Sequence, residues 1–154
     1  MNKERKLIES NAIVVFNEDI TASELIKLIE DFNGDVVING TLFLDDHITM
    51  KCNLYVSNIE NMAFGGCVIN CERDLYCFGD INNPLQINVR GILWCKGNID
   101  CRGIHVNEGL YCNSNIIAYH HNVIVAGDFD CNSIESAKLA VFGTMNIRNT
   151  LSIS

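Results

Sequence analysis

A short pattern recurs at a nearly fixed distance along this chain. Leu-Tyr-Cys begins at Leu75, Leu-Trp-Cys begins at Leu93 and Leu-Tyr-Cys begins again at Leu110. Self-similarity at a constant period is typical of repeat architectures, in which each copy packs only against its neighbours. The copies are too short to bury an apolar face alone, so each must stack on the next.

Each period divides into three shorter units. A unit consists of an apolar residue, an outward residue, a second apolar or small residue, another outward residue, and then Gly, Asn or Ser. Unit starts recur mostly at intervals of five to seven residues from Val36 to Leu151, and Met62 is one of them. Three units per turn place Leu75 over Leu93 and Leu93 over Leu110. We therefore predict an all-β fold, a three-sided parallel β-helix of about seven turns over residues 36–154.

Alternation along a strand assigns the inward positions. In the triplet that starts at Leu75, Leu75 and Cys77 point inward and Tyr76 points outward. Six of the eight cysteines occupy the third position of their units, and we expect them to form a buried ladder of free thiols: Cys71, Cys77, Cys95, Cys101, Cys112 and Cys131. No cofactor or metal is expected, since the chain has no Cys-x-x-Cys pair.

The turns between units are rich in Gly, Asn and Asp. Gly79-Asp80, Gly97-Asn98 and Gly127-Asp128 lie between units, as does the Asn-Ser-Asn run at 113–115. We expect these residues at corners of the coil, where the backbone often needs a left-handed φ.

The N-terminal residues 1–35 follow a different pattern. The stretch 12–16 reads as a short strand, and residues 21–33 carry helical apolar spacing. Thr21 and Glu24 have the spacing of a capping box, and Gly34 stands where a helix C-cap belongs. We expect this helix to seal the first turn of the β-helix.

Composition narrows the class of protein. The 154 residues carry a net charge of −8 without a long block of either sign, so nucleic-acid binding is not expected. The first ten residues lack the apolar core of a signal peptide, and no run of about 18 apolar residues provides a membrane span. We expect a cytoplasmic location.

The units VIVAGDF, LYCFGDI and LAVFGTM resemble those of bactofilins, the bacterial polymer-forming cytoskeletal proteins. The resemblance covers about residues 36–154. It implies a right-handed three-sided β-helix that assembles end to end into filaments without nucleotide and serves as a scaffold. The chain departs from the family pattern because it has one proline and a predicted helix, where bactofilins usually have flexible, often proline-rich tails.

Two surfaces are candidates for contact with other chains. The first is a row of outward aromatic residues on one side of the coil, here called the aromatic stripe: Tyr55, Tyr76, Phe78, Trp94 and Tyr111. We expect it to form a lateral homodimer or to bind a partner protein. The alternative is that these rings only stabilise one another across neighbouring strands.

The second surface is the C-terminal end of the coil, residues 139–154. An uncapped coil end exposes unpaired N–H and C=O groups that can pair with another chain. End-to-end association is expected through six inward residues: Leu139, Val141, Met145, Ile147, Leu151 and Ile153. The alternative is that Arg148, polar corners and fraying protect the edge.

Three other classes of protein share single features with this sequence. Hexapeptide-repeat acyltransferases also have three-sided coils, left-handed ones, and a catalytic histidine, and the histidines of this chain are His47, His105, His120 and His121. A polysaccharide lyase or hydrolase needs grouped carboxylates, for which Asp128 and Asp130 are the nearest match. A pentapeptide-repeat mimic of DNA is a more remote alternative. The sequence favours a non-enzymatic structural or scaffolding protein, with an acyltransferase as the alternative.

Overall fold

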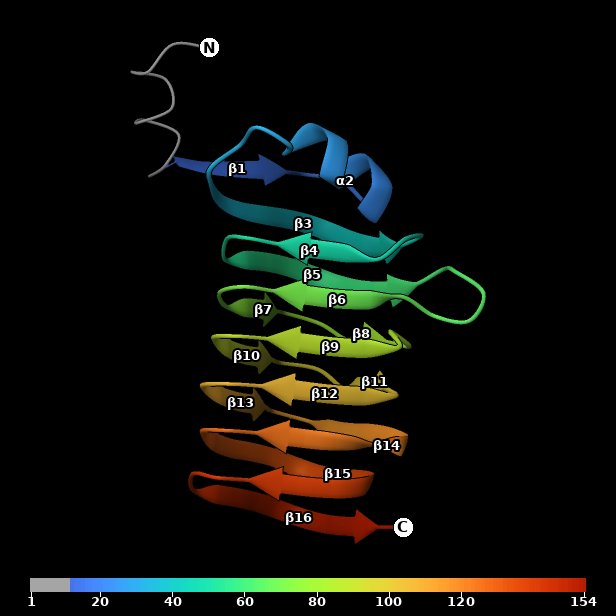
Figure 1. The fold of residues 1–154 in the computed structure, drawn as a ribbon, viewed down its shortest axis with the longest axis vertical. Helices are drawn as coiled ribbons and strands as arrows, with labels where there is room; N and C mark the ends of the chain where they lie inside the picture. Colours follow the sequence, from blue (N-terminus) through green and yellow to red (C-terminus); the bar gives the residue numbers. More distant parts are fainter. Residues whose placement is uncertain (1–11) are drawn as a thin grey trace.

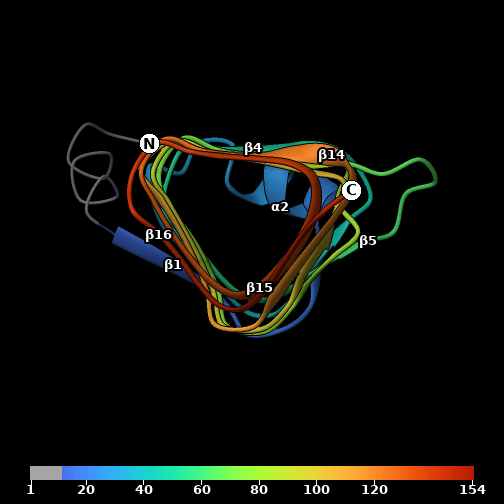
Figure 2. The ribbon, with the colours of Figure 1, turned by 90° about the horizontal axis from the view of Figure 1, so that it is seen from below.

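The computed structural model describes residues 12–154, except for the side chains of Tyr119 and His120. It is a parallel β-solenoid of about eight turns with one short helix near the N-terminus (Figure 1), as the sequence predicted. Viewed along its axis, the coil is triangular (Figure 2). As the chain descends from N to C, the near strands in Figure 1 run leftward, so the coil is right-handed.

The first side of the triangle contains the Leu-aromatic-Cys triplets. Leu75, Leu93 and Leu110 pair in one register across three turns, which confirms the predicted stacking. The strands of this side are β1 (Ala12–Phe16), β7 (Leu75–Cys77), β10 (Ile92–Cys95) and β13 (Gly109–Cys112), with the first parts of β3 (Gly34–Leu44), β5 (Leu54–Asn61), β15 (Asp128–Val141) and β16 (Met145–Ile153).

The second side contains β2 (Ile20–Thr21), β8 (Ile81–Asn82), β11 (Ile99–Cys101) and the first part of β14 (Asn115–Val125), with later parts of β3, β5, β15 and β16. The third side contains β4 (Ile48–Met50), β6 (Val68–Cys71), β9 (Gln86–Val89) and β12 (Gly103–Val106), followed by the ends of β14 and β15. The structure has about eight turns rather than seven, because β1 and β2 pair with β3.

Helix α2 (Ala22–Leu28) begins with the predicted capping box, in which the Thr21 side chain accepts from the Glu24 backbone N–H. Its end differs from the prediction. The C-cap is Ile29, and Gly34 instead opens β3, where it pairs with Ala12 of β1. An extended, paired residue cannot cap a helix, and the helix ends at Leu28 rather than at the predicted residue 33. In Figure 2, α2 lies next to β4 within the outline of the triangle.

Inward side chains form one continuous apolar core along the coil axis. The six cysteines at third positions are all buried, as predicted, but they do not form a single ladder. Cys77, Cys95 and Cys112 stack in register on the first side. Cys71 faces Val89 on the third side and Cys101 faces Ala118 on the second. The repeating unit is therefore the same on all sides, but each side has its own stack.

The expected left-handed corners are absent at Gly79, Gly97 and Gly127. Among the described residues, positive φ angles occur only at Asn83, Gly65 and Gly66. Space, not φ, requires glycine at the corners: a Cβ on Gly79 would collide with the Asn58 side chain of the preceding turn. Glycine is thus needed because successive turns approach closely.

One corner of the coil is longer than the others, and the unit predicted there is wrong. Met62, assigned as an inward unit start, is 60% exposed and lies in the loop between β5 and β6. Gly65 and Gly66 form its turn, and the loop projects from the coil in both views (Figures 1 and 2). Within residues 12–154, no helix is long and apolar enough to cross a membrane.

Candidate interaction surfaces

The aromatic stripe lies on the first side, where the strand register places its members in successive turns. Tyr55 pairs with Tyr76, Tyr76 with Trp94, and Trp94 with Tyr111. These four side chains are half-buried, whereas Phe78, beside them, is 53% exposed. The sequence therefore predicted correctly which aromatic side chains share a side of the coil.

The rings of the stripe pack on one another. The Tyr55 and Tyr76 rings are stacked, with centroids 4.8 Å apart and planes within 6°. Phe78 and Trp94 form an edge-to-face pair at 5.5 Å. Contacts of this kind stabilise neighbouring strands. Part of the ring surface is buried in contacts between neighbouring turns, and Phe78 offers the largest exposed part to another molecule.

Two phenols of the stripe, those of Tyr55 and Tyr76, are held in their neutral form. The Tyr76 hydroxyl donates to Oδ2 of Asp74 at 3.0 Å. Burial, this hydrogen bond and the Asp74 charge together raise the pKa of Tyr76 to about 12. Burial and the charges of Asp35 and Asp74 also raise the pKa of Tyr55. A partner would therefore meet uncharged hydroxyl groups near a carboxylate.

At the C-terminal end, inward residues of the last turn are exposed because no further turn packs on them. Phe129 is 1% exposed, but its register partner Met145 is 50% exposed. Ile134 is 2% exposed and its partner Leu151 is 48% exposed. Ile153 is also 50% exposed, while Leu139, Val141 and Ile147 stay partly buried against the core. All six predicted contact residues thus lie at this end.

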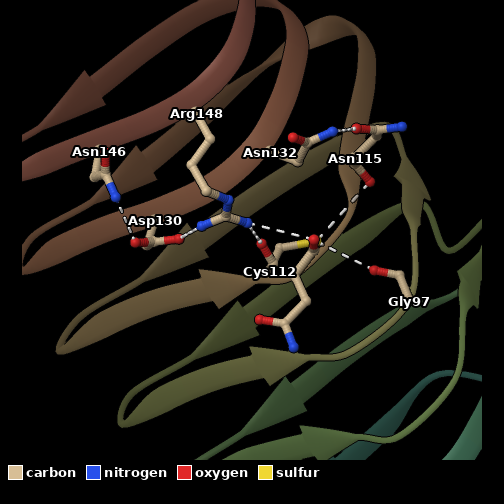
Figure 3. A network of polar contacts seen from close by, with 8 residues as sticks. Gly97, Cys112, Asn115, Asp130, Asn132, Asn146 and Arg148 are labelled. Carbon is tan, nitrogen blue, oxygen red and sulfur yellow. Dashed lines mark hydrogen bonds and ion pairs between the residues drawn. The ribbon is translucent and has the colours of Figure 1, made fainter.

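Strand β16 pairs with β15 on one edge, and no described strand pairs with its other edge. Arg148 does not cover that edge. Its guanidinium points back along the coil to the carboxylate of Asp130 and to the carbonyl oxygens of Cys112 (3.1 Å) and Asn113 (3.3 Å), as Figure 3 shows for the labelled residues. Asn146 also donates to Asp130, at 2.8 Å. These contacts hold the last turn against the two turns before it, and the outer edge of β16 stays unpaired.

The structure also groups polar side chains that the sequence patterns did not single out. On the third side, Thr49, Asn70, Asn88 and His105 pair in register across successive turns, and we call them the polar column. They line a hollow of about 350 Å³ together with Glu72, Arg90 and Asn107. Their common outward position in the repeat is visible in the sequence once the register is known.

The histidines considered for catalysis do not converge. His47 is structural, since its Nδ1 accepts the backbone N–H of Val68 at 2.8 Å. His105 belongs to the polar column, while His121 lines a separate hollow at the corner between the second and third sides. The side chain of His120 lies outside the described part. Asp128 and Asp130 flank Phe129 as expected, but Asp128 accepts from the Thr144 backbone N–H and Asp130 pairs with Arg148.

The comparisons with known proteins gave no relatives: no family model, no curated protein and no solved structure matches this chain.

Proposed function

We propose that this chain is a non-enzymatic structural or scaffolding protein that associates with itself end to end through the last turn of its solenoid. The supporting observation is the exposure of core positions there: Met145 and Leu151 are about half exposed, whereas the residues one turn earlier are buried. Apolar side chains beside an unpaired strand edge favour addition of another β-strand, because burial and backbone hydrogen bonds form together.

The aromatic stripe is the second proposed contact surface, for a lateral homodimer or for a partner protein. Phe78 is its most exposed member and would lie at the centre of such a contact. This arrangement, a rod that grows at its end and binds partners along one side, is the role that the resemblance to bactofilins implies. We propose a cytoplasmic location on the same basis.

The acyltransferase alternative has less support from the geometry. The coil is right-handed, and the described histidine side chains lie apart on different corners and sides of it. Acyl transfer needs a base and oriented polar groups around one pocket. The structural proposal requires only burial and strand pairing.

The deciding experiment is light scattering behind a sizing column across protein concentration, followed by negative-stain microscopy. The wild-type chain should give dimers or filaments whose population grows with concentration. Leu151→Asp should abolish them, because a charge would be buried at the contact. Asn107→Asp adds the same charge at an exposed corner in the middle of the rod and should leave assembly intact. A wild-type monomer at all concentrations would refute the proposal, and a stable trimer would favour the acyltransferase.

A further inference from the structure

The polar column of the third side carries an inference that goes beyond self-association and does not depend on it. The column spans four successive turns, a length of about 14 Å at the spacing of paired strands. Thr49 and His105 at its ends are exposed, while Asn70 and Asn88 between them are half-buried. It is a straight, accessible row of hydrogen-bonding groups on a rigid sheet.

The amides of the column are held in a fixed orientation. Gln86 Nε2 donates to Asn88 Oδ1 at 3.2 Å, and Asn88 Nδ2 donates to Asn70 Oδ1 at 2.8 Å. This series of hydrogen bonds ends at the Asn70 amide nitrogen, which donates to no other described residue. Groups fixed in this way lose little conformational entropy when a ligand binds.

The remaining lining sets the chemistry of the ligand. The hollow has a carboxylate at Glu72, a guanidinium at Arg90 and a third amide at Asn107, all on exposed side chains. Apolar ligands would leave these groups without partners. Opposite charges side by side give no net preference for an anion or a cation. A ligand that donates and accepts hydrogen bonds at many points along its length fits best, and hydroxyl groups do both.

We infer that the third side is a binding site for a neutral oligosaccharide, which lies along the polar column parallel to the coil axis. Its hydroxyl groups accept from the Asn70 and Arg90 N–H groups and donate to Glu72 and to the Thr49 oxygen. The column is bounded at both ends: helix α2 packs near β4, and after His105 the next outward residues of this side are Ile124 and Ala140. The polar column therefore contacts only a few sugar units of the ligand.

The histidines provide a direct reporter for this binding. The chain has four histidines, so the imidazole C2–H signals are few enough to resolve by proton NMR, and His105→Gln assigns the signal of His105. The probes are cellotetraose and maltotetraose at millimolar concentration, with tetragalacturonate as an anionic comparison. We expect a saturable shift of the His105 signal with at least one neutral tetrasaccharide and no shift of His47. The measurement is made on Leu151→Asp, so that end-to-end assembly plays no part.

Two variants test whether the column itself binds. Asn88→Asp keeps the size of the side chain but cannot donate to Asn70, and it should weaken binding at least tenfold. Asn113→Ala removes an amide from an exposed corner off this face and should bind like the parent. The inference is wrong if no neutral probe shifts His105, if only the anionic probe does, or if folded Asn88→Asp binds with unchanged affinity.

Discussion

The guanidinium of Arg148 lies 3.1 Å from the carbonyl oxygen of Cys112, a residue 36 positions earlier in the chain. Because a turn takes about 18 residues, this one side chain connects strands two turns apart, β16 and β13, and pairs with Asp130 on the turn between them. The last turn is therefore held by a side chain as well as by its strand pairing with β15.

Arg148→Gln should loosen the last turn without unfolding the coil. The ion pair is partly exposed, so the expected loss is about 1 kcal/mol and local to β16. Amide hydrogen exchange should become faster in residues 145–153 and stay unchanged in β10. Lys138→Gln, which removes an exposed charge elsewhere, serves as the control. Equal exchange in wild type and Arg148→Gln would show that the clamp contributes nothing.

Gly97→Ala should destabilise the whole protein. The added Cβ would collide with the Asp80 side chain and the backbone of Gly79, and the turn cannot move without breaking the Asn98 N–H bond to Asp80 (2.7 Å). We expect a loss of about 2 kcal/mol in the free energy of unfolding, measured in urea. Asn113→Ala, one turn later, should change it by less than about 0.5 kcal/mol. Similar values for both would contradict the close-approach explanation.

Cys52 and Cys131 should react slowly at neutral pH, and their raised pKa values should make stability fall at alkaline pH. Burial raises the pKa of Cys131 to about 12, and burial together with the Asp35 charge raises that of Cys52 to about 11, from 9.0. A raised folded-state pKa favours the protonated thiol in the fold. This stabilisation is complete below pH 9 and is lost as pH rises toward 11 to 12.

Two measurements check the thiols. A thiol reagent at pH 8 should modify native protein slowly, Cys52 first because it is the only cysteine that is not fully buried, and all eight quickly in urea. Urea unfolding should give a constant free energy from pH 7 to 8.5 and a decrease above pH 9. Rapid labelling of the native protein would show that the core opens readily.

Phe78→Asp should preserve the fold and remove any lateral contact. The side chain is 53% exposed, so its loss costs little packing beyond the edge-to-face pair with Trp94. Scattering measurements on a Leu151→Asp background isolate lateral association from end-to-end association. Glu60→Lys, an exposed change on the second side, is the matched control. A lateral dimer that survives Phe78→Asp would assign the stripe to intramolecular stacking alone.

The sequence predicted the coil well because its signal is repeated many times: each turn repeats the inward Leu or Ile and the outward aromatic or polar residue. Errors occurred where one element departs from the repeat. Met62 is apolar and spaced like a unit start, but the two glycines after it form a projecting loop. Gly34 has the position of a helix C-cap in the sequence, but strand pairing with β1 decides its conformation.

The candidate surfaces were predictable to different degrees. The aromatic stripe stood out because an aromatic residue recurs directly after the inward leucines of the first side. The polar column was harder to recognise because Thr49, Asn70, Asn88 and His105 are four ordinary polar residues, although their spacing of 21, 18 and 17 positions equals that of the four half-buried stripe residues. Each of them follows an inward isoleucine, and the structure shows that the four line one hollow.

The in-register stacking of Leu75 on Leu93 makes the coil modular in length. A duplicated segment from residue 75 to residue 92 would begin and end at equivalent points of the repeat, so it would add one whole turn and extend the rod by about 4.8 Å. Core, corners and both ends would keep their neighbours. Gene duplication of one turn is thus a route by which such a chain changes the distance between its two ends as a molecular ruler does, while its surfaces stay the same.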